Sequence, residues 1–302
     1  MNVDVMYDAS EIVHYDTPGI PLYIREGLLS LYPNSRALCH WHEDIEFIHN
    51  FEGHMDYYIN GKHILIKEHD GLLITPKQMH YGYSSDKSEC HFSCILIHPS
   101  AFCSSRKLLQ KYIQPLLENI HIEFYYLHSN HPAENKILSY LDEIYALKQR
   151  QEAGYELEVI GLFHILWAEF FRLIPQESLT HQGIENNDIT VQRKMVSFIY
   201  QNYASKLTLD EISASGGVCR SKCCQIFKKY LNHTPIEFLN IYRLEVSQYL
   251  LKQTDVPITD IAFSCGFNHL SYYSEMFRQY YGCTPKEYRS QYHTDPETKS
   301  CE

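Results

Sequence analysis

Four side chains in the first third of the chain are of types that either ligate transition metals or bind small polar molecules. His40, His42 and Glu46 stand at even spacings, and His80 follows later. Alternate residues of a strand share a face, so these three would point to one side and residues such as Phe47 to the other. Three imidazoles and a carboxylate suit iron, manganese, nickel or zinc. The same groups could instead hydrogen-bond a sugar or a carboxylate.

The surrounding segment, from about residue 20 to 128, consists of short apolar runs separated by turn residues. Asn60-Gly61 separates two such runs, which is the pattern of a two-residue hairpin. Further strands are predicted at 71–76 and 90–97. Many short strands at regular spacing predict a β-sandwich or a small β-barrel.

Two spaced motifs contain the four candidate ligands. They are His40-x-His42-x3-Glu46-x6-Gly53 and Gly71-x4-Pro76-x3-His80. The first resembles the first motif of the cupin family at every spacing. The second resembles the second cupin motif but is one residue short before the proline, with Gln78 in place of its internal glycine. The resemblance covers about residues 20–100 and implies a cupin-like β-barrel around an internal pocket.

The apolar period changes between about residues 134 and 174. Ile137, Leu141 and Ile144, and later Ile160 and Phe163, recur at three- and four-residue steps, which predicts two amphipathic helices. Such a pair could cap the barrel or pair with a second copy of the chain. The aperiodic segment 176–189 is predicted to be a linker, and the first domain to span residues 1–175.

The last hundred residues contain an internal repeat. Leu209, Gly217, Phe227 and Thr234-Pro235 recur 49 or 50 residues later as Ile258, Gly266, Phe277 and Thr284-Pro285. Each unit has a short helix, a glycine turn and a second amphipathic helix, so the repeat predicts two helix-turn-helix units at about 208–231 and 257–281. One continuous helix, 236–252, joins them. The domain is predicted to span 190–292, followed by a tail at 293–302.

The charge distribution favours DNA as the partner of this repeat. Residues 190–292 contain 12 Lys and Arg against 8 Asp and Glu, whereas the whole chain has a net charge of −11. A basic segment beside an acidic one is typical of a nucleic-acid module joined to another domain. The second helix of a helix-turn-helix enters the major groove, where each base pair shows a distinct pattern of donors and acceptors.

The C-terminal segment resembles the DNA-binding domain of AraC/XylS-type transcriptional regulators. The residues that carry the resemblance are Ile261, Ala262, Cys265, Gly266, Phe267, Phe277, Gly282, Thr284, Pro285, Tyr288 and Arg289. The first unit departs from the family pattern at Asn232, where glycine is more usual, but asparagine tolerates the same left-handed helix end. The resemblance implies a sequence-specific regulator with an α+β architecture of two domains, a cupin-like β-barrel with a helical pair and an all-α domain with two helix-turn-helix units.

The same resemblance implies which residues contact DNA. Positions near the start and middle of each second helix would contact bases, and flanking basic residues would contact the DNA backbone. The implied base contacts are Ser221, Cys224, Gln225, Ser271, Tyr272 and Glu275. The implied backbone contacts are Arg220, Lys228, Arg243 and Arg278.

Regulators of this type often keep such histidines in a pocket for an organic effector, so we expect an effector there and no metal cofactor. The candidate pocket residues are Arg36, His40, His42, Glu46, Tyr57 and His80. A metal held by His40, His42, Glu46 and His80 stays open as the alternative. The expected partners are double-stranded promoter DNA, a small effector such as a sugar or related metabolite, and a second copy of the chain; RNA polymerase is a further candidate.

Other classes of protein fit the sequence less well. The chain shows no basic leader followed by an apolar run and no long apolar stretch, which predicts a cytoplasmic protein without a membrane partner. Cys219, Cys223 and Cys224 lack the second pair of cysteines that structural zinc sites use.

The second function considered is a metal-dependent cupin enzyme with a helical accessory domain, but it leaves the repeat unexplained. We therefore expect a regulator that is not an enzyme.

Overall fold

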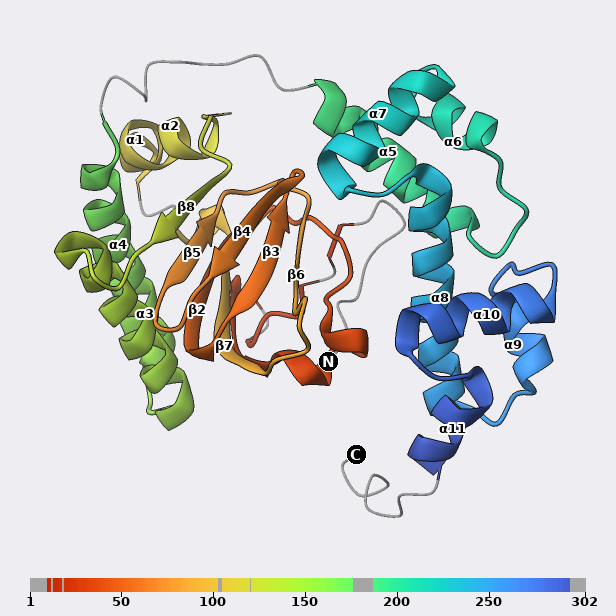
Figure 1. The fold of residues 1–302 in the computed structure, drawn as a ribbon. Helices are drawn as coiled ribbons and strands as arrows, with labels where there is room; N and C mark the ends of the chain where they lie inside the picture. Colours follow the sequence, from red (N-terminus) through yellow and green to blue (C-terminus); the bar gives the residue numbers. More distant parts are fainter. Residues whose placement is uncertain are drawn as a thin grey trace. The chain divides into compact units, whose positions relative to one another are not determined.

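The computed structural model describes residues 10–293 except positions 12, 18, 103–104, 120 and 176–186. The chain divides near residue 189 into two units, which we call the sensor unit and the DNA-binding unit and describe separately (Figure 1). Most of the predicted linker, 176–186, and the tail from 294 onward lie outside the described residues. Residues 187–189 begin a helix rather than ending the linker.

The sensor unit contains two antiparallel sheets. Five strands form the first sheet in the order β1-β7-β2-β5-β8, and three strands form the second in the order β4-β3-β6. The strands are β1 Leu22–Leu28, β2 Ile45–Gly53, β3 Met55–Ile59, β4 Lys62–Ile66, β5 Gly71–Ile74, β6 His80–Tyr83, β7 Cys90–Ile97 and β8 Phe124–Leu127. Short helical turns join them: η1 Leu29–Leu31, η2 Pro33–Ser35, η3 Pro99–Phe102, α1 Arg106–Leu108, η4 Leu109–Ile113 and α2 Gln114–Leu117.

The predicted hairpin at Asn60-Gly61 joins β3 to β4. Both residues have positive φ, 48° and 82°, which is the conformation that a two-residue hairpin turn requires. Ile59 pairs with Lys62 across the turn, and this register continues to Met55 and Ile66.

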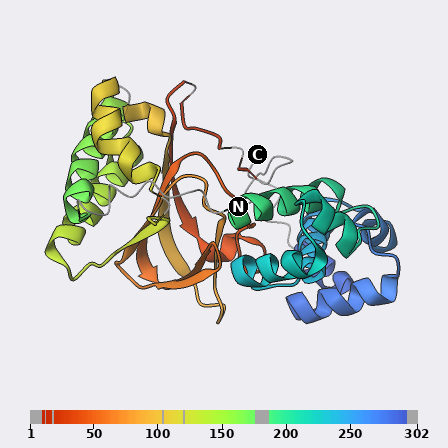
Figure 2. The ribbon, with the colours of Figure 1, turned by 90° about the horizontal axis from the view of Figure 1, so that it is seen from above.

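Two helices cover the outer face of the five-stranded sheet (Figures 1 and 2). They are α3, Pro132–Arg150, and α4, Tyr155–Leu173, in agreement with the predicted pair. Their apolar faces pack on one set of strand residues, which includes Leu22, Ile24 and Phe47. The alternate residues of the same strands face the second sheet, where Ile48 meets Met55. The sensor unit therefore has one core outside the sheet and one between the sheets.

The DNA-binding unit is entirely helical in its described residues. Its helices are α5 Asn187–Asn202, α6 Leu209–Ser215, α7 Arg220–Leu231, α8 Pro235–Gln253, α9 Ile258–Ser264, α10 Leu270–Tyr281 and α11 Pro285–His293. The predicted helix-turn-helix units are the pairs α6–α7 and α9–α10, joined by α8.

The repeated Thr-Pro pairs mark helix starts. Thr234 caps α8 by accepting from the Glu237 backbone N–H, while Glu237 accepts from the Thr234 N–H, and proline occupies the first helical position. Thr284 and Glu287 repeat this capping box before α11. Asn232, the departure from the family pattern, ends α7 with φ of 59°, as the sequence predicted. Among the described helices, none is long and apolar enough to cross a bilayer.

Candidate effector pocket and DNA-reading helices

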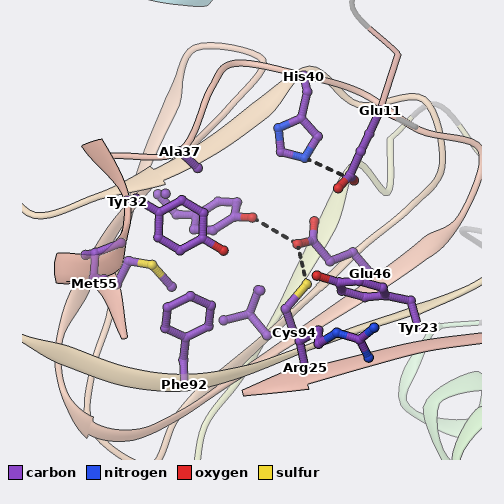
Figure 3. A pocket seen from close by; sticks show the side chains of 14 residues that line it. Glu11, Tyr23, Arg25, Tyr32, Ala37, His40, Glu46, Met55, Phe92 and Cys94 are labelled. Atoms are coloured by element: carbon purple, nitrogen blue, oxygen red, sulfur yellow. Dashed lines mark hydrogen bonds and ion pairs between the residues drawn. The ribbon is translucent and has the colours of Figure 1, made fainter. Parts of the chain in front are cut away.

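A cavity of about 190 Å³ lies between the two sheets of the sensor unit (Figure 3). Its walls come from β1, β2, β3, β6 and β7 and from the segments before β1 and β2. The lining residues are Glu11, Tyr23, Arg25, Leu29, Tyr32, Ala37, His40, Glu46, Ile48, Met55, Tyr57, Gly82, Phe92 and Cys94.

The two ends of the pocket differ in chemistry. Met55 and Phe92 lie at one end beside the ring of Tyr32, whereas Glu46, Cys94 and Arg25 lie at the other (Figure 3). The Arg25 guanidinium forms an ion pair with Asp16 and lies 4.7 Å from the centroid of the Tyr23 ring. The pocket can therefore hold a molecule that has both an apolar face and polar groups.

Glu46 is held in one orientation by two donors. Its Oε1 accepts from the Tyr57 hydroxyl at 3.2 Å and from the Cys94 thiol at 3.5 Å. Burial and the charge of Glu46 raise the pKa values of Tyr57 and Cys94 well above their ordinary range, so both remain protonated. Glu46 Oε2 points instead at two imidazoles, 2.9 Å from His80 Nε2 and 3.6 Å from His42 Nε2.

The carboxyl group of Glu46 is ionised despite its burial. Burial alone would raise its pKa, but attraction by His80 and His42 outweighs this and holds the pKa of Glu46 well below its usual range. Burial, reinforced by the neighbouring His80, lowers the pKa of His40 well below its usual value, so the His40 ring is neutral. His40 Nε2 lies 3.6 Å from Glu11 Oε2 at the rim.

The three predicted histidines meet in one cluster. Their available ring nitrogens lie within 4.8 Å of one another, and all three residues are buried. Backbone pairing between His40 and His80 brings the two cupin-like motifs together. Gln78, where cupins have glycine, bonds to Asn60, Thr75 and Pro76 and so closes the loop that leads to His80. The shortened motif therefore still places His80 beside Glu46.

The predicted pocket residues divide into three groups. His40, Glu46 and Tyr57 line the cavity. His42 and His80 lie beside Glu46 but are not among the lining residues. Arg36 packs its guanidinium over the Tyr81 ring, 4.3 Å from the centroid, and does not line the cavity.

Sequence reasoning missed most of the lining from β1 and β7. Tyr23 and Arg25 alternate with the buried Leu22 and Ile24, and Phe92 belongs to the same kind of alternating strand. The alternation was a usable signal that these residues face the opposite side of the sheet from the helices. It did not show that this side contains a cavity.

The second helices of both helix-turn-helix units keep an exposed face. Each buries a few apolar residues, such as Phe227 in α7 and Phe277 in α10. The predicted base contacts Ser221, Gln225, Ser271, Tyr272 and Glu275 are exposed, and Cys224 is half-buried. Tyr272 also accepts a hydrogen bond from Asn240 of α8 at 3.2 Å. These positions are available for groove contacts.

Three of the four predicted backbone contacts are exposed, and Arg243 is not. Arg220, Lys228 and Arg278 lie at the surface. Arg243 is only 8% exposed, and its guanidinium donates to the carbonyl oxygens of Tyr203 and Ser205 at 2.8 and 2.7 Å. This geometry is at odds with the predicted phosphate contact and gives Arg243 a structural role. The sequence could not show this because the turn after α5 lies 40 residues away.

Arg220 is exposed, but it forms a bidentate ion pair with Asp210 across the first helix-turn-helix. A phosphate contact by Arg220 has to compete with that pair. Asp210→Asn is therefore expected to increase affinity for specific and non-specific DNA alike, by roughly three- to tenfold at low salt. Fluorescence anisotropy with two labelled duplexes measures this effect.

Asp260→Asn is the matched control, since Asp260 is an exposed carboxylate in the first turn of α9. It removes the same charge, and in the described contacts it has no arginine partner. Equal gains from both substitutions, or no gain from either, would refute a specific competition for Arg220.

Comparisons with known proteins agree with this division of the chain. The AraC-like ligand binding domain family matches residues 26–164, and a helix-turn-helix domain family matches residues 212–291. The HTH-type transcriptional regulator YdeC of Bacillus subtilis is 26% identical over 288 residues, 95% of this chain and 98% of that protein. The HTH-type transcriptional activator RhaS of Escherichia fergusonii is 27% identical over 141 residues, 47% of this chain and 50% of that protein.

Among solved structures, ToxT from Vibrio cholerae with a bound unsaturated fatty acid is 15% identical. The similarity covers 89% of this chain and 94% of ToxT, with a TM-score of 0.46. The two family matches stand in the order that the sequence predicted, and each coincides with one structural unit. The chain thus has an AraC-like ligand binding domain at residues 26–164 ahead of a helix-turn-helix domain at residues 212–291, and it is similar over nearly its whole length to an HTH-type transcriptional regulator.

Proposed function

We propose that this protein is a cytoplasmic, homodimeric regulator whose binding to promoter DNA changes when a small metabolite enters the sensor pocket. The observation that carries the proposal is the pocket between the sheets, with its polar and apolar ends in a unit of the ligand-binding family. An effector can shift the balance between two conformations of a protein only if it binds one of them more tightly than the other. The effector would therefore act by stabilising one conformation, which binds promoter DNA more tightly or more weakly than the other.

The pocket suits a small effector that carries several oxygen atoms. A cavity of about 150 Å³ holds a benzene molecule, so a cavity of about 190 Å³ suits a molecule of similar size or slightly larger. Arg25, Glu46 and Tyr57 can hydrogen-bond hydroxyl or carboxylate groups, while Tyr32 and Phe92 provide flat apolar faces. These features favour a sugar or a related metabolite.

The two second helices supply the DNA contacts in this proposal. Gln225 of α7 can bond bidentately to adenine, and Glu275 of α10 can accept from cytosine. The joining helix α8 has 19 residues and is about 28 Å long. This length is compatible with α7 and α10 entering successive major-groove segments about 34 Å apart.

The exposed side of α4 supports the proposal that two copies pair. Leu157 is 76% exposed and Ile165 is 49% exposed, two turns apart on one helix. Gly161 lies between them with open space around its Cα, and Ala168 continues the exposed stripe. A dimer would present four reading heads and gain affinity from their linkage.

The experiment that tests the function is a selection of genomic fragments by the full-length protein at about 0.15 M salt, with pools of metabolites added or omitted. We expect enrichment of a few upstream regions that contain two short boxes about one helical turn apart. Metabolites that alter the enrichment are then tested singly by thermal shift. Enrichment no greater than that of random fragments, under every condition, would contradict the proposal.

Tyr57→Phe is expected to weaken the effector response without changing effector-free DNA binding. The substitution keeps the ring but removes a hydroxyl that faces the pocket and donates to Glu46. One lost hydrogen bond corresponds to roughly a three- to tenfold increase in the effector concentration needed. Anisotropy titrations of operator DNA against effector measure the midpoint.

The neighbouring Tyr58→Phe is the control, because Tyr58 contacts Tyr81 and His63 and is not among the lining residues. Its midpoint should equal that of the wild type. Equal midpoints in all three proteins would show that the effector does not bind in this pocket.

A further inference from the structure

A second cavity of the sensor unit lies outside the β-sheets and takes no part in the proposed function. Its volume is about 330 Å³, against about 190 Å³ for the sensor pocket between the sheets. It lies where α1 and η4 meet the last turns of α4 (Figure 1). Leu108 and Ala168, which line it, are exposed, so the cavity opens to solvent. A small molecule can therefore reach it from outside.

Three aromatic side chains line this cavity. Trp167 is only 2% exposed, and its Nε1–H donates to Tyr112 O at 3.0 Å. The rings of Tyr112 and Phe171 meet edge to face, with their centroids 5.3 Å apart. Because the indole N–H is already satisfied, these side chains offer a ligand flat apolar surface. Such a surface suits an aromatic ring system.

The segment that faces α4 across the cavity has an unusual backbone. η4, Leu109–Ile113, is a turn of π-helix that leads directly into α2. Pro115 interrupts the regular α-helical pattern here, because proline has no N–H to donate to the carbonyl oxygen four residues earlier and clashes with it. Turns of π-helix are rare and are frequent at functional sites. In this chain the π-turn places Tyr112 and Ile113 in the wall of the cavity.

The rim of the cavity is positively charged. Arg172 lines it, and Lys111 Nζ lies 4.9 Å from the centroid of the Tyr112 ring. Arg172 pairs with Glu169 at 2.9 Å, but Glu169 also pairs with Lys136 at 2.6 Å. In these described ion pairs one carboxylate thus serves two cations, which leaves a net positive charge beside the cavity. The rim would therefore attract an anionic group on a ligand.

We propose that this cavity, which we call the α4 pocket, binds a flat apolar molecule with one anionic group, such as an aromatic carboxylate or sulfonate. The rings of the ligand would lie against Tyr112, Trp167 and Phe171, and its anionic group beside Arg172. A cavity of about 150 Å³ holds one benzene molecule, so about 330 Å³ has room for two fused rings. The sensor pocket is too small for them by the same measure.

A second copy of the chain is the competing occupant of the α4 pocket. Ala168 belongs both to the lining and to the exposed stripe of α4 that contains Leu157 and Ile165. The stripe presents uncharged aliphatic side chains, which would leave the charge of Arg172 unused. The aromatic wall and the positive rim together favour a small aromatic anion.

The test titrates the full-length protein with two fluorescent probes that share one ring system. 8-Anilinonaphthalene-1-sulfonate carries a sulfonate, and N-phenyl-1-naphthylamine is its uncharged parent. We expect both probes to saturate at one per chain, and added salt should weaken the binding of the sulfonate alone. Folded wild-type protein that binds neither probe with saturation would overturn the proposal.

Arg172→Ala tests the charged rim. It should weaken binding of the sulfonate about three- to fivefold and leave binding of the uncharged probe unchanged, because exposed ion pairs contribute modestly. Arg150→Ala is the matched control, since Arg150 is an exposed arginine at the end of α3 that does not line the α4 pocket. Equal losses for both probes, or equal effects of both substitutions, would overturn the assignment of an anionic ligand.

Ala168→Phe tests the cavity itself. A phenyl ring at this position would fill the space that the probe needs, so binding of both probes should weaken at least about tenfold. Ala133→Phe is the matched control, since Ala133 is an exposed alanine in the first turn of α3. Unchanged binding by folded Ala168→Phe would place the probes elsewhere and overturn the proposal. If this variant fails to fold, Arg172→Ala decides alone.

The protein concentration separates a small anion from a second copy. If side chains of a partner filled the α4 pocket, the apparent affinity for the sulfonate would fall as the protein passed from monomer to dimer in sedimentation velocity. That result would overturn the proposal, and a constant affinity would support it. DNA enrichment in the genomic selection by a protein that binds neither probe would refute the α4 pocket and leave the regulator.

Discussion

Arg243→Ala is expected to destabilise the DNA-binding unit by about 2–4 kcal/mol and to leave the sensor unit unchanged. The Arg243 guanidinium donates to Tyr203 O and Ser205 O and lies 5.8 Å from the centroid of the Phe267 ring. Its removal leaves two carbonyl oxygens without their charged donor and opens a space beside Phe267. Hydrogen bonds to charged groups are each worth about 1.5–3 kcal/mol.

The location of Arg243 makes this loss larger than that of a surface arginine. Tyr203–Ser205 is the turn after α5, Arg243 is in α8, and Phe267 precedes α10. Tyr242 reinforces the same junction by stacking on Tyr200 at 4.1 Å. The junction therefore ties the helix before the first reading unit to the second unit, and its loss should loosen the spacing between the reading heads.

Two optical signals separate the two units in the intact chain. Both tryptophans, Trp41 and Trp167, lie in the sensor unit, so their fluorescence reports its unfolding alone. The far-UV circular dichroism signal includes the contribution of the helices of the DNA-binding unit as well. In urea, Arg243→Ala should shift part of the dichroism transition to lower concentration and leave the fluorescence transition in place.

Arg278→Ala is the matched control, because Arg278 is exposed on α10. It should leave both transitions unchanged, weaken binding to all DNA sequences alike and lower the salt slope by about one. If Arg243→Ala instead gave this pattern, with unchanged stability, Arg243 would be the phosphate contact that the family resemblance implied.

The architecture was predictable because its signals are local. The hairpin at Asn60-Gly61 and the capping boxes at Thr234 and Thr284 depend on residues within a few positions of one another. The two helix-turn-helix units were predictable because the same local pattern occurs twice. These elements can be recognised without predicting which distant segments of the chain pair with one another.

The site was less predictable because its geometry depends on contacts between distant segments. The alternation in β1 showed that Tyr23 and Arg25 share a face, but not that this face meets β3 across a cavity. The motif around His80 was judged incomplete from its spacing, yet Gln78 rebuilds the loop and His80 reaches Glu46.

Gly266→Ala is expected to destabilise the DNA-binding unit by about 3–4 kcal/mol, roughly twice as much as Gly217→Ala. The two glycines occupy equivalent turns of the repeated units, and both have positive φ, 84° and 67°. Alanine is strained at either position by about 1–2 kcal/mol. At Gly266 a Cβ would also lie 2.4 Å from Tyr203 O and 3.0 Å from Ala204 O, whereas at Gly217 nothing lies within 4 Å.

The difference between these variants isolates the close approach from the backbone strain that both share. Because the clash is with backbone atoms, neither a rotamer change nor a small side-chain shift relieves it. Hydrogen exchange of the full-length protein should show lost protection in α9 and α10 for Gly266→Ala, and near-normal protection in α6 and α7 for Gly217→Ala. Equal losses would mean that positive φ alone accounts for both glycines. A larger loss of protection in Gly266→Ala would show that the second turn requires glycine because the carbonyl oxygens of Tyr203 and Ala204, just after α5, pack directly against it.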